Sequence, residues 1–346
     1  MRGLRMLALG LACGLAALPA VAAARHARPA QSKQEAKADA ARTKALIGFQ
    51  HDLVSVLAPQ TGAQPLLGAA LLARPLPDQP KVNSFPVLIG RAAQAPDAGP
   101  AVTWARLSDC DAKGAGCPNP KALDQLLAQA PDNAAVWLLK MGQDTRDLHK
   151  KAARDDLARA AQAKLYDDYA GASLKALANA VGLLPPPPAT IATGAGAGPA
   201  GVQMMIAFSV ASAQPQPSLQ LVADLCKDQA AGDDAVKRDC LKLGKLLEWG
   251  SSPLARSLGL HLRETLDPDP AQQQQARDAR RDLVWQVQNF AQLATRAQSD
   301  ASLAQHLLAL ARNGGTQMSL ILAALRDEDI ATEAPAAPPA PASSTR

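Results

Sequence analysis

Apolar residues recur every three or four positions along most of the chain, which is the spacing of one face of an α-helix. The clearest segment is 271–297, whose apolar stripe is Ala276, Leu283, Val287, Phe290 and Ala294. A helix is also expected from about residue 33 to residue 58, where Pro59 ends it. The pattern predicts further helices over 66–73, 87–95, 171–181, 201–213, 218–230, 234–249, 253–266, 303–311 and 318–325. We therefore expect an all-α protein.

The composition supports this fold class. Alanine accounts for 75 of the 346 residues, and aromatic residues for only 3%. Alanine and leucine are strong helix formers, whereas the β-branched and aromatic residues that favour strands are scarce. This composition excludes a β-sandwich or a β-barrel.

A repeat is visible in the first half of the chain. Gln94-Ala95-Pro96-Asp97 recurs 35 residues later, over 129–132, and each copy is followed by a tryptophan. The two tryptophans, Trp104 and Trp137, lie 33 residues apart. A period near 34 residues is typical of stacked helix–turn–helix units. Tryptophans at equivalent positions of such units are both expected to be buried; two exposed aromatic platforms that stack on sugars are the alternative.

The motifs around these tryptophans resemble the tetratricopeptide repeat family. Trp104-x2-Leu107 matches the pattern of that family's first helix, and Ala153-x3-Leu157-x2-Ala160 matches that of its second helix. Lys140 and Met141 depart from the pattern after Trp137, and the resemblance covers about one fifth of the chain. It implies stacked antiparallel helical hairpins, a tetratricopeptide-like solenoid that holds peptides or other proteins. The residues expected to pack the repeats are Trp104, Trp137, Ala153, Leu157 and Ala160.

Composition shifts divide the chain into segments. Four prolines over 185–188 precede a glycine-rich run, and because no strand comes before that run we interpret it as a linker between two helical halves. The predicted segments are a signal peptide (1–24), a basic arm with N-terminal helices (25–84), tetratricopeptide-like repeats (85–184), the linker (185–200), a C-terminal helical domain (201–328) and a disordered Ala/Pro tail (329–346).

The first residues have the pattern of an export signal. Arg2 and Arg5 precede an apolar run over 6–21, and small residues follow at two sites that signal peptidase reads. We therefore expect a mature chain that begins at Ala23 or Arg25, in the periplasm or secreted. The run is too short for a membrane anchor, Gly10 disfavours lipidation at Cys13, and no later stretch is apolar enough to span a bilayer.

Four cysteines follow the predicted signal. An even number of cysteines in an exported chain indicates disulfides. Three pairings are possible, and sequence proximity favours Cys110 with Cys117 and Cys226 with Cys240. A zinc site is disfavoured, because no two cysteines or histidines stand at the short spacing of metal ligands.

The positive charge of the chain belongs to its N-terminal part. The formal net charge is +5, of which Arg2 and Arg5 supply two charges and residues 25–50 supply four. The rest of the chain is close to neutral. A body without excess positive charge is not expected to bind nucleic acid.

Few residues stand out as candidates for chemistry. Tyr166-Asp167-Asp168-Tyr169 is expected to cap the following helix with an aspartate while the tyrosines pack at the junction; a metal-binding or acid–base carboxylate pair is the alternative. None of the five histidines has a partner histidine three or four positions away, and no hydrolase, nucleotide or metalloprotease motif is present. We therefore assign no catalytic residue, no metal ligand and no cofactor.

These observations favour an exported scaffold that binds a protein or peptide partner without catalysis. Two alternatives stay open: a structural protein whose basic arm docks on an anionic envelope polymer, and a helical enzyme that acts on cell-wall glycan. A deep cleft with paired carboxylates would favour the enzyme. An apolar concave face with few charges would favour the scaffold.

Overall fold

The computed structural model describes residues 33–110, 117–192, 196–230 and 232–335, and over these ranges it is all-α, as predicted. No β-strand occurs in this part of the chain, only an isolated parallel bridge between Asn133 and Leu165. The predicted signal peptide, the middle of the glycine-rich run and the end of the tail lie outside the described residues.

The helices follow one another with short connections. They are α1 (Lys33–Leu57), α2 (Ala63–Ala73), α3 (Phe85–Gln94), α4 (Pro100–Arg106), α5 (Pro120–Gln129), α6 (Ala134–Arg146), α7 (Lys150–Gln162), α8 (Ala170–Val181), α9 (Gly198–Ser212), α10 (Leu219–Gln229), α11 (Asp234–Leu247), α12 (Pro253–Leu266), α13 (Pro270–Arg296), α14 (Ala301–Asn313) and α15 (Gln317–Asp327). Two short 3-10 helices, Lys81–Asn83 and Pro188–Thr190, complete the set.

Local sequence accounts for many of the helix ends. Asp233 caps α11, because its Oδ1 accepts hydrogen bonds from the backbone N–H groups of Ala235 and Val236 at 2.9 and 3.1 Å. Asp300 caps α14 in the same way. Proline occupies the first turn of α12 and α13, where its missing N–H leaves no intrahelical hydrogen bond unmade.

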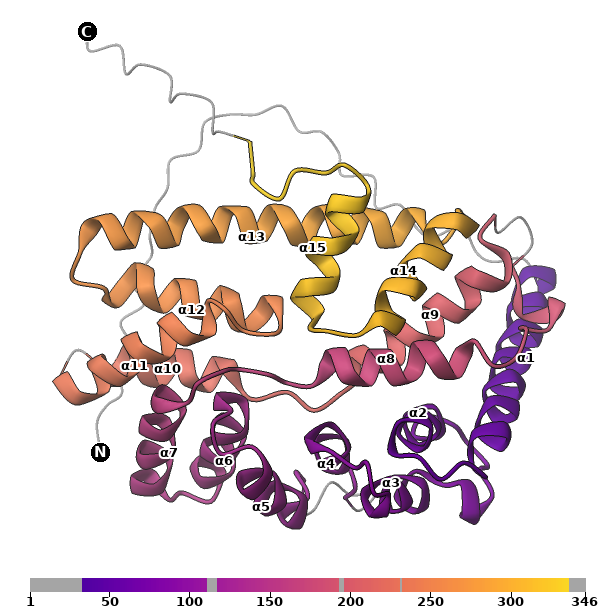
Figure 1. Ribbon diagram of the computed structural model, residues 1–346, viewed down its shortest axis with the longest axis horizontal. Coiled ribbons are helices and arrows are strands. Elements are labelled where there is room, and N and C mark those ends of the chain that lie inside the picture. Colours follow the sequence, from indigo (N-terminus) through magenta and orange to yellow (C-terminus); the bar gives the residue numbers. More distant parts are fainter. Residues whose placement is uncertain (1–32, 111–116, 193–195, 231, 336–346) are drawn as a thin grey trace, which may run out of the picture. The chain divides into compact units, whose positions relative to one another are not determined.

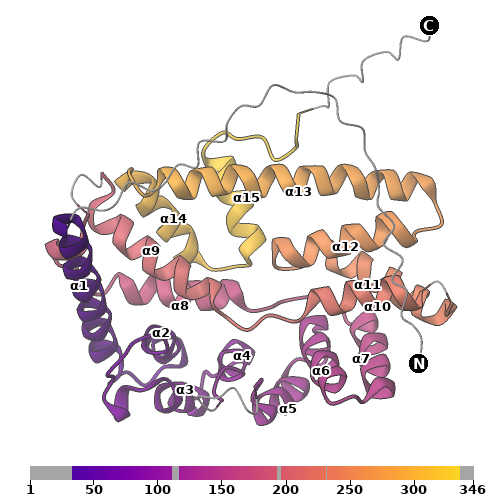
Figure 2. The same ribbon diagram turned by 180° about the vertical axis from the view of Figure 1, so that it is seen from behind.

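The chain divides into residues 1–40 and a compact body of residues 41–346. Within this body, α8 packs against α2, α9 and α14, while α11 packs against α7 and α12. The ribbon of the body shows α2 to α7 on one side of the α8–α11 layer and α12 to α15 on the other side (Figure 1). Figure 2 shows the same three tiers from behind.

Two hydrophobic clusters form the core of the body, and both combine residues from before and after segment 185–200. One cluster joins side chains of α1–α4 and α8 with side chains of α9 and α12–α15. The other joins α4–α7 with α10–α12. The prediction that this segment links two separate helical halves is therefore wrong. The prolines lead into the 3-10 turn Pro188–Thr190, whose buried Thr190 bonds back to the carbonyl of Pro187, and α9 then returns along α8.

The beginning of the predicted disordered tail has a defined position. Trp285 on α13 donates a hydrogen bond from Nε1 to the carbonyl of Ala331 at 2.8 Å, and Gln286 donates to the carbonyl of Thr332 at 2.8 Å. Asp282 accepts a hydrogen bond from the backbone N–H of Ala334 at 3.0 Å. Residues 331–334 therefore lie along α13, which corrects the prediction for that part of the tail.

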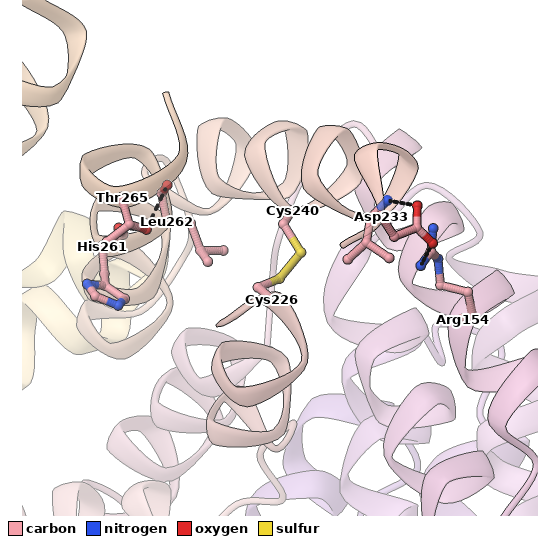
Figure 3. Close-up of a disulfide and its surroundings, with 8 residues drawn as sticks. Arg154, Cys226, Asp233, Cys240, His261, Leu262 and Thr265 are labelled. Carbon is pink, nitrogen blue, oxygen red and sulfur yellow. Dashed lines mark hydrogen bonds and ion pairs between the residues drawn. A yellow bond between two sulfur atoms is a disulfide. The ribbon is translucent and has the colours of Figure 1, made fainter. Parts of the chain in front are cut away.

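The cysteines form the two local pairs. Cys226 on α10 and Cys240 on α11 are both buried, and their Cα atoms lie 5.8 Å apart. Figure 3 shows this disulfide between the two helices, with His261 of α12 on one side and Arg154 beside Asp233 on the other. Cys110 and Cys117 have Cα atoms 5.4 Å apart and close the turn between α4 and α5. None of the helices described has both the length and the hydrophobicity that a bilayer crossing needs.

Candidate functional site

The two repeat tryptophans have different environments. Trp104 on α4 is fully buried; its ring centroid lies 5.4 Å from that of Tyr169, and its Nε1 donates a hydrogen bond to the carbonyl of Pro215 at 3.1 Å. Trp137 on α6 is partly exposed, and the guanidinium of Arg159 on α7 lies 4.7 Å above its ring. The prediction of burial is correct for Trp104 and wrong for Trp137, because an arginine covers that ring and leaves part of it in solvent.

The other residues predicted to pack the repeats are buried. Ala153, Leu157 and Ala160 form one buried stripe on α7, within the same hydrophobic cluster as Trp104. Helices α6 and α7 pack closely as an antiparallel pair. These contacts are compatible with a tetratricopeptide-like hairpin, and the assignment of a repeat remains a prediction.

A groove lies beside the connection between α9 and α10, residues 213–218. Its larger section has a volume of about 510 Å³, and a second section of about 370 Å³ adjoins it. Both sections share Arg74, Ala213 and Gln214. Arg74 lies where the two sections meet and is held there by two hydrogen bonds. Its Nη2 donates to the carbonyl of Ala213 at 2.6 Å, and its Nη1 donates to Ser108 Oγ at 3.0 Å.

Trp104 supports the same connection from inside the core through its bond to Pro215. The groove therefore has one wall that is tied to α2 by Arg74 and to α4 by Trp104. The sequence pattern predicts only a packing role for Trp104 and gives no sign of the groove, because Arg74 and Ala213 are 139 residues apart in the chain.

The described lining of the groove is basic and apolar. Arg74 and Arg146 contribute guanidinium groups, and no aspartate or glutamate lines either section. Burial lowers the pKa of Arg74, whose guanidinium nevertheless stays protonated in a protein. In the same region Gln214 is buried and its Oε1 has no hydrogen-bond donor among the described residues. The apolar part consists of Leu107, Pro118, Leu138 and Leu139 in the larger section and Ile47, Leu71, Leu76 and Val210 in the smaller.

A pair of buried carboxyl groups lies elsewhere, inside the α6–α7 hairpin. Asp144 receives a hydrogen bond from Lys140 Nζ at 2.5 Å, and its Oδ1 lies 3.7 Å from His149 Nδ1. Burial, together with the adjacent Asp144 carboxylate, raises the pKa of Asp156 to about 7. Burial also acts to raise the pKa of Asp144, but the hydrogen bonds from Lys140 and Asp156 outweigh it and hold that pKa below its ordinary value.

This pair could share a proton, as two adjacent carboxyl groups do. Asp144, Asp147 and His149 also offer ligand atoms within 4.8 Å of one another, although Asp147 and His149 are exposed. Asp144 and Asp156 line neither section of the groove. They were missed in the sequence, and their spacing gives no signal, because the two aspartates lie at unequal distances from the turn of the hairpin, residues 147–149.

The Tyr166–Tyr169 segment joins α7 to α8. The N-cap residue of α8 is Tyr169, which makes no side-chain capping hydrogen bond, so the prediction of an aspartate at the cap is wrong. Asp168, one residue earlier, accepts a hydrogen bond at Oδ1 from the backbone N–H of Ala170, the first residue of α8, at 3.3 Å. Tyr166 is buried, and Tyr169 packs on Trp104. Burial raises the pKa of Asp167, whose Oδ1 accepts a hydrogen bond from the backbone N–H of Tyr169 at 2.9 Å.

Comparison of the chain with protein-family models, with curated proteins and with solved structures finds no match. The resemblance to the tetratricopeptide repeat therefore rests on its short motifs alone.

Proposed function

We propose that this protein is an exported helical scaffold that binds a peptide segment of a partner protein in the groove beside residues 213–218. The observation that carries the proposal is the lining of the groove: two arginines, apolar side chains, no carboxylate among the described residues, and a buried amide oxygen that lacks a donor. Catalysis is not part of the proposal.

Each of these features suits a peptide. The apolar section around Leu138 and Leu139 offers a place for an aliphatic side chain, and burying such a chain favours association. Gln214 Oε1 can accept a hydrogen bond from a peptide N–H group, which would relieve the cost of a buried oxygen without a donor. Arg146 is exposed and forms no ion pair within the described residues, so its guanidinium is available to a carboxylate.

The same lining speaks against the two alternative functions. A sugar-binding cleft commonly offers aromatic faces, yet neither section of the groove is lined by an aromatic residue in the described part of the chain. The buried pair Asp144 and Asp156 could support acid–base chemistry, but it lines no part of this groove. An acidic peptide with apolar side chains is therefore the ligand that the groove favours.

Export is supported by the two disulfides, because such bonds persist in oxidising compartments. The expected start of the mature chain is Ala23 or Arg25. N-terminal sequencing of the protein from a periplasmic fraction tests this part of the proposal, and a functional protein that retains Met1 would contradict it.

The groove is tested by selecting peptides from a random phage-displayed library on the wild-type protein. We expect enrichment of sequences with an acidic residue next to aliphatic residues. Arg146→Glu should weaken a selected peptide about tenfold or more, as expected when an attractive charge becomes repulsive. Lys151→Glu makes the same charge change at an exposed position of α7 outside the groove and serves as the control.

Equal losses in the two variants would indicate general attraction to a basic surface and would favour the anionic-polymer alternative. Failure to enrich any peptide, or enriched peptides that bind the Arg146→Glu variant as tightly as the wild type, would contradict the proposal.

A further inference from the structure

A second cavity, separate in its chemistry from the groove, contains a buried carboxylate without a counter-charge. Asp168 is only 1% exposed, and its Oδ1 accepts hydrogen bonds from Ser251 Oγ at 3.0 Å and from the backbone N–H of Ala170 at 3.3 Å. Its Oδ2 is equally buried but has no hydrogen-bond donor within the ranges that the structure describes. No lysine, arginine or histidine of those ranges forms an ion pair with it.

Such a carboxylate is costly for the folded protein. A buried charge normally has a partner of opposite charge, because the loss of hydration otherwise exceeds what the fold gains. The buried arginine of this body, Arg263, shows the usual solution, since it pairs with Glu248 and also donates to Gln272. Asp168 has no cationic partner among the residues described, and the hydrogen-bonding capacity of its Oδ2 is unused.

Asp168 lines a cavity of about 300 Å³ whose other walls are mostly apolar. These walls come from five helices and include Leu174 on α8, Phe208 on α9, Leu254 on α12, Phe290 on α13 and Leu320 on α15. Asp168 is the single ionisable residue among the described lining residues. The exposed side chains of Gln216 and Gln317 line the cavity as well, so that it opens to solvent near them.

We propose that this cavity binds a small organic ammonium ion, a primary amine that carries an aliphatic or aromatic group, with the ammonium on Asp168 Oδ2. An ammonium supplies both the missing hydrogen bond and the missing positive charge, in surroundings where a low dielectric constant strengthens the attraction. The rings of Phe208 and Phe290 also favour a cation, and the leucines suit the hydrocarbon part. At about 30 Å³ for each water-sized group, the cavity has room for about ten non-hydrogen atoms.

The experiment uses the whole protein and three probes of one shape but different charge: 2-phenylethylammonium, the neutral 2-phenylethanol and the anionic 3-phenylpropanoate. Binding is measured at neutral pH by isothermal titration calorimetry and by the shift of the melting temperature. We expect the ammonium to bind at least about tenfold more tightly than the alcohol, and the anion not to bind. Asp168→Asn should reduce the affinity for the ammonium at least about tenfold.

Asp156→Asn is the matched control, because it changes another buried carboxyl group to the same amide in a different part of the body. Leu254→Ala provides a second variant that keeps the carboxylate: this side chain is 62% exposed, so the fold should tolerate its loss, while the affinity for the ammonium should fall about threefold. Arg146→Glu, which tests the groove, should leave the binding of the ammonium unchanged.

Three results would overturn the inference: no binding of the ammonium at millimolar concentration, equal affinities for the ammonium and the alcohol, or an unchanged affinity in a folded Asp168→Asn variant. If the Asp168→Asn variant does not fold, an unchanged affinity of the Leu254→Ala variant for the ammonium would likewise overturn the inference. The inference does not depend on the proposed peptide groove, since the two cavities have linings of opposite charge.

Discussion

The different surroundings of Trp104 and Trp137 lead to a quantitative prediction about stability. Trp104→Ala removes a fully buried ring, for which core substitutions cost about 3–5 kcal/mol. It also removes the ring contact with Tyr169 and the hydrogen bond to Pro215, worth roughly 1 kcal/mol each. Because part of these contacts is already included in the cost of removing the ring, we expect a loss of about 4–5 kcal/mol in the free energy of unfolding.

Trp104→Phe separates the hydrogen bond from the bulk of the ring. Phenylalanine retains a six-membered ring against Tyr169 but has no donor for the carbonyl of Pro215. The missing hydrogen bond and the smaller volume should together cost about 2 kcal/mol. Amide hydrogen exchange in segment 213–218 should become faster, because this segment loses its link to α4.

Trp137→Ala is the control for the pair. Its ring is partly exposed, so its burial contributes less, and the contact with Arg159 is worth about 0.5–1 kcal/mol. Its Nε1 also donates a hydrogen bond to the carbonyl of Pro131 at 2.7 Å, worth roughly 1 kcal/mol. The expected loss is about 2–3 kcal/mol. The assay is urea unfolding followed by far-UV circular dichroism, since both substitutions alter the tryptophan fluorescence. If Trp104→Ala costs no more than Trp137→Ala, then Trp104 does not occupy the core and the support that we assign to the groove is refuted.

Further expectations concern a carboxyl group, a disulfide and a helix crossing. The pKa of Asp156 is raised to about 7 in the folded protein, so between about pH 4 and about pH 7 the folded protein keeps a proton that the unfolded chain has released. The free energy of unfolding should therefore fall as the pH rises through this range. Asp156→Asn should flatten this pH dependence in urea titrations, and an unchanged profile would contradict the assignment. Replacing Cys226 and Cys240, 14 residues apart, with alanine should lower the free energy of unfolding by about 3 kcal/mol, and an unchanged urea midpoint would argue against the bond. A Cβ on Gly259 would overlap the backbone of Glu248 on the neighbouring chain segment, so Gly259→Ala should lower the melting temperature. A Cβ on Gly90 would meet nothing within 4 Å, so Gly90→Ala should raise the free energy of unfolding by up to about 1 kcal/mol. A Gly259→Ala variant more stable than the Gly90→Ala variant would refute the close crossing at Gly259.

Local features of the sequence were sufficient for the bounds of many helices, although they gave none for α4 to α7. The range predicted for α12, residues 253–266, agrees with the structure at both ends, because Pro253 favours a first turn and Pro268 and Pro270 prevent continuation. Asp233 caps α11 for the same kind of local reason: its short side chain reaches the first free N–H groups of the helix. Information of this kind lies within a few residues.

The interleaved cores and the candidate sites could not be predicted in this way. An apolar stripe shows that a helix buries one face but not which distant helix covers it. Nothing near Arg74 points to Ala213, and an alanine- and proline-rich tail gives no sign that Trp285 and Gln286 will bind its backbone. The four prolines at 185–188 suggested a linker, since a composition alone does not distinguish an extended spacer from a turn packed by Thr190.

The connection between α9 and α10 relates the two proposed sites. Ala213 and Gln214 line the groove, while Gln216 lines both the groove and the cavity at Asp168. Arg74 and Trp104 fix the first half of this connection through its carbonyl groups. A ligand that changes the position of Gln216 in one cavity must therefore alter the wall of the other. Because a coupling between two binding equilibria is reciprocal, any effect of the ammonium on peptide affinity must equal the effect of the peptide on ammonium affinity. The opposite charges of the two linings keep their ligands distinct, so that such coupling would pass through the shared segment and not through competition for one site.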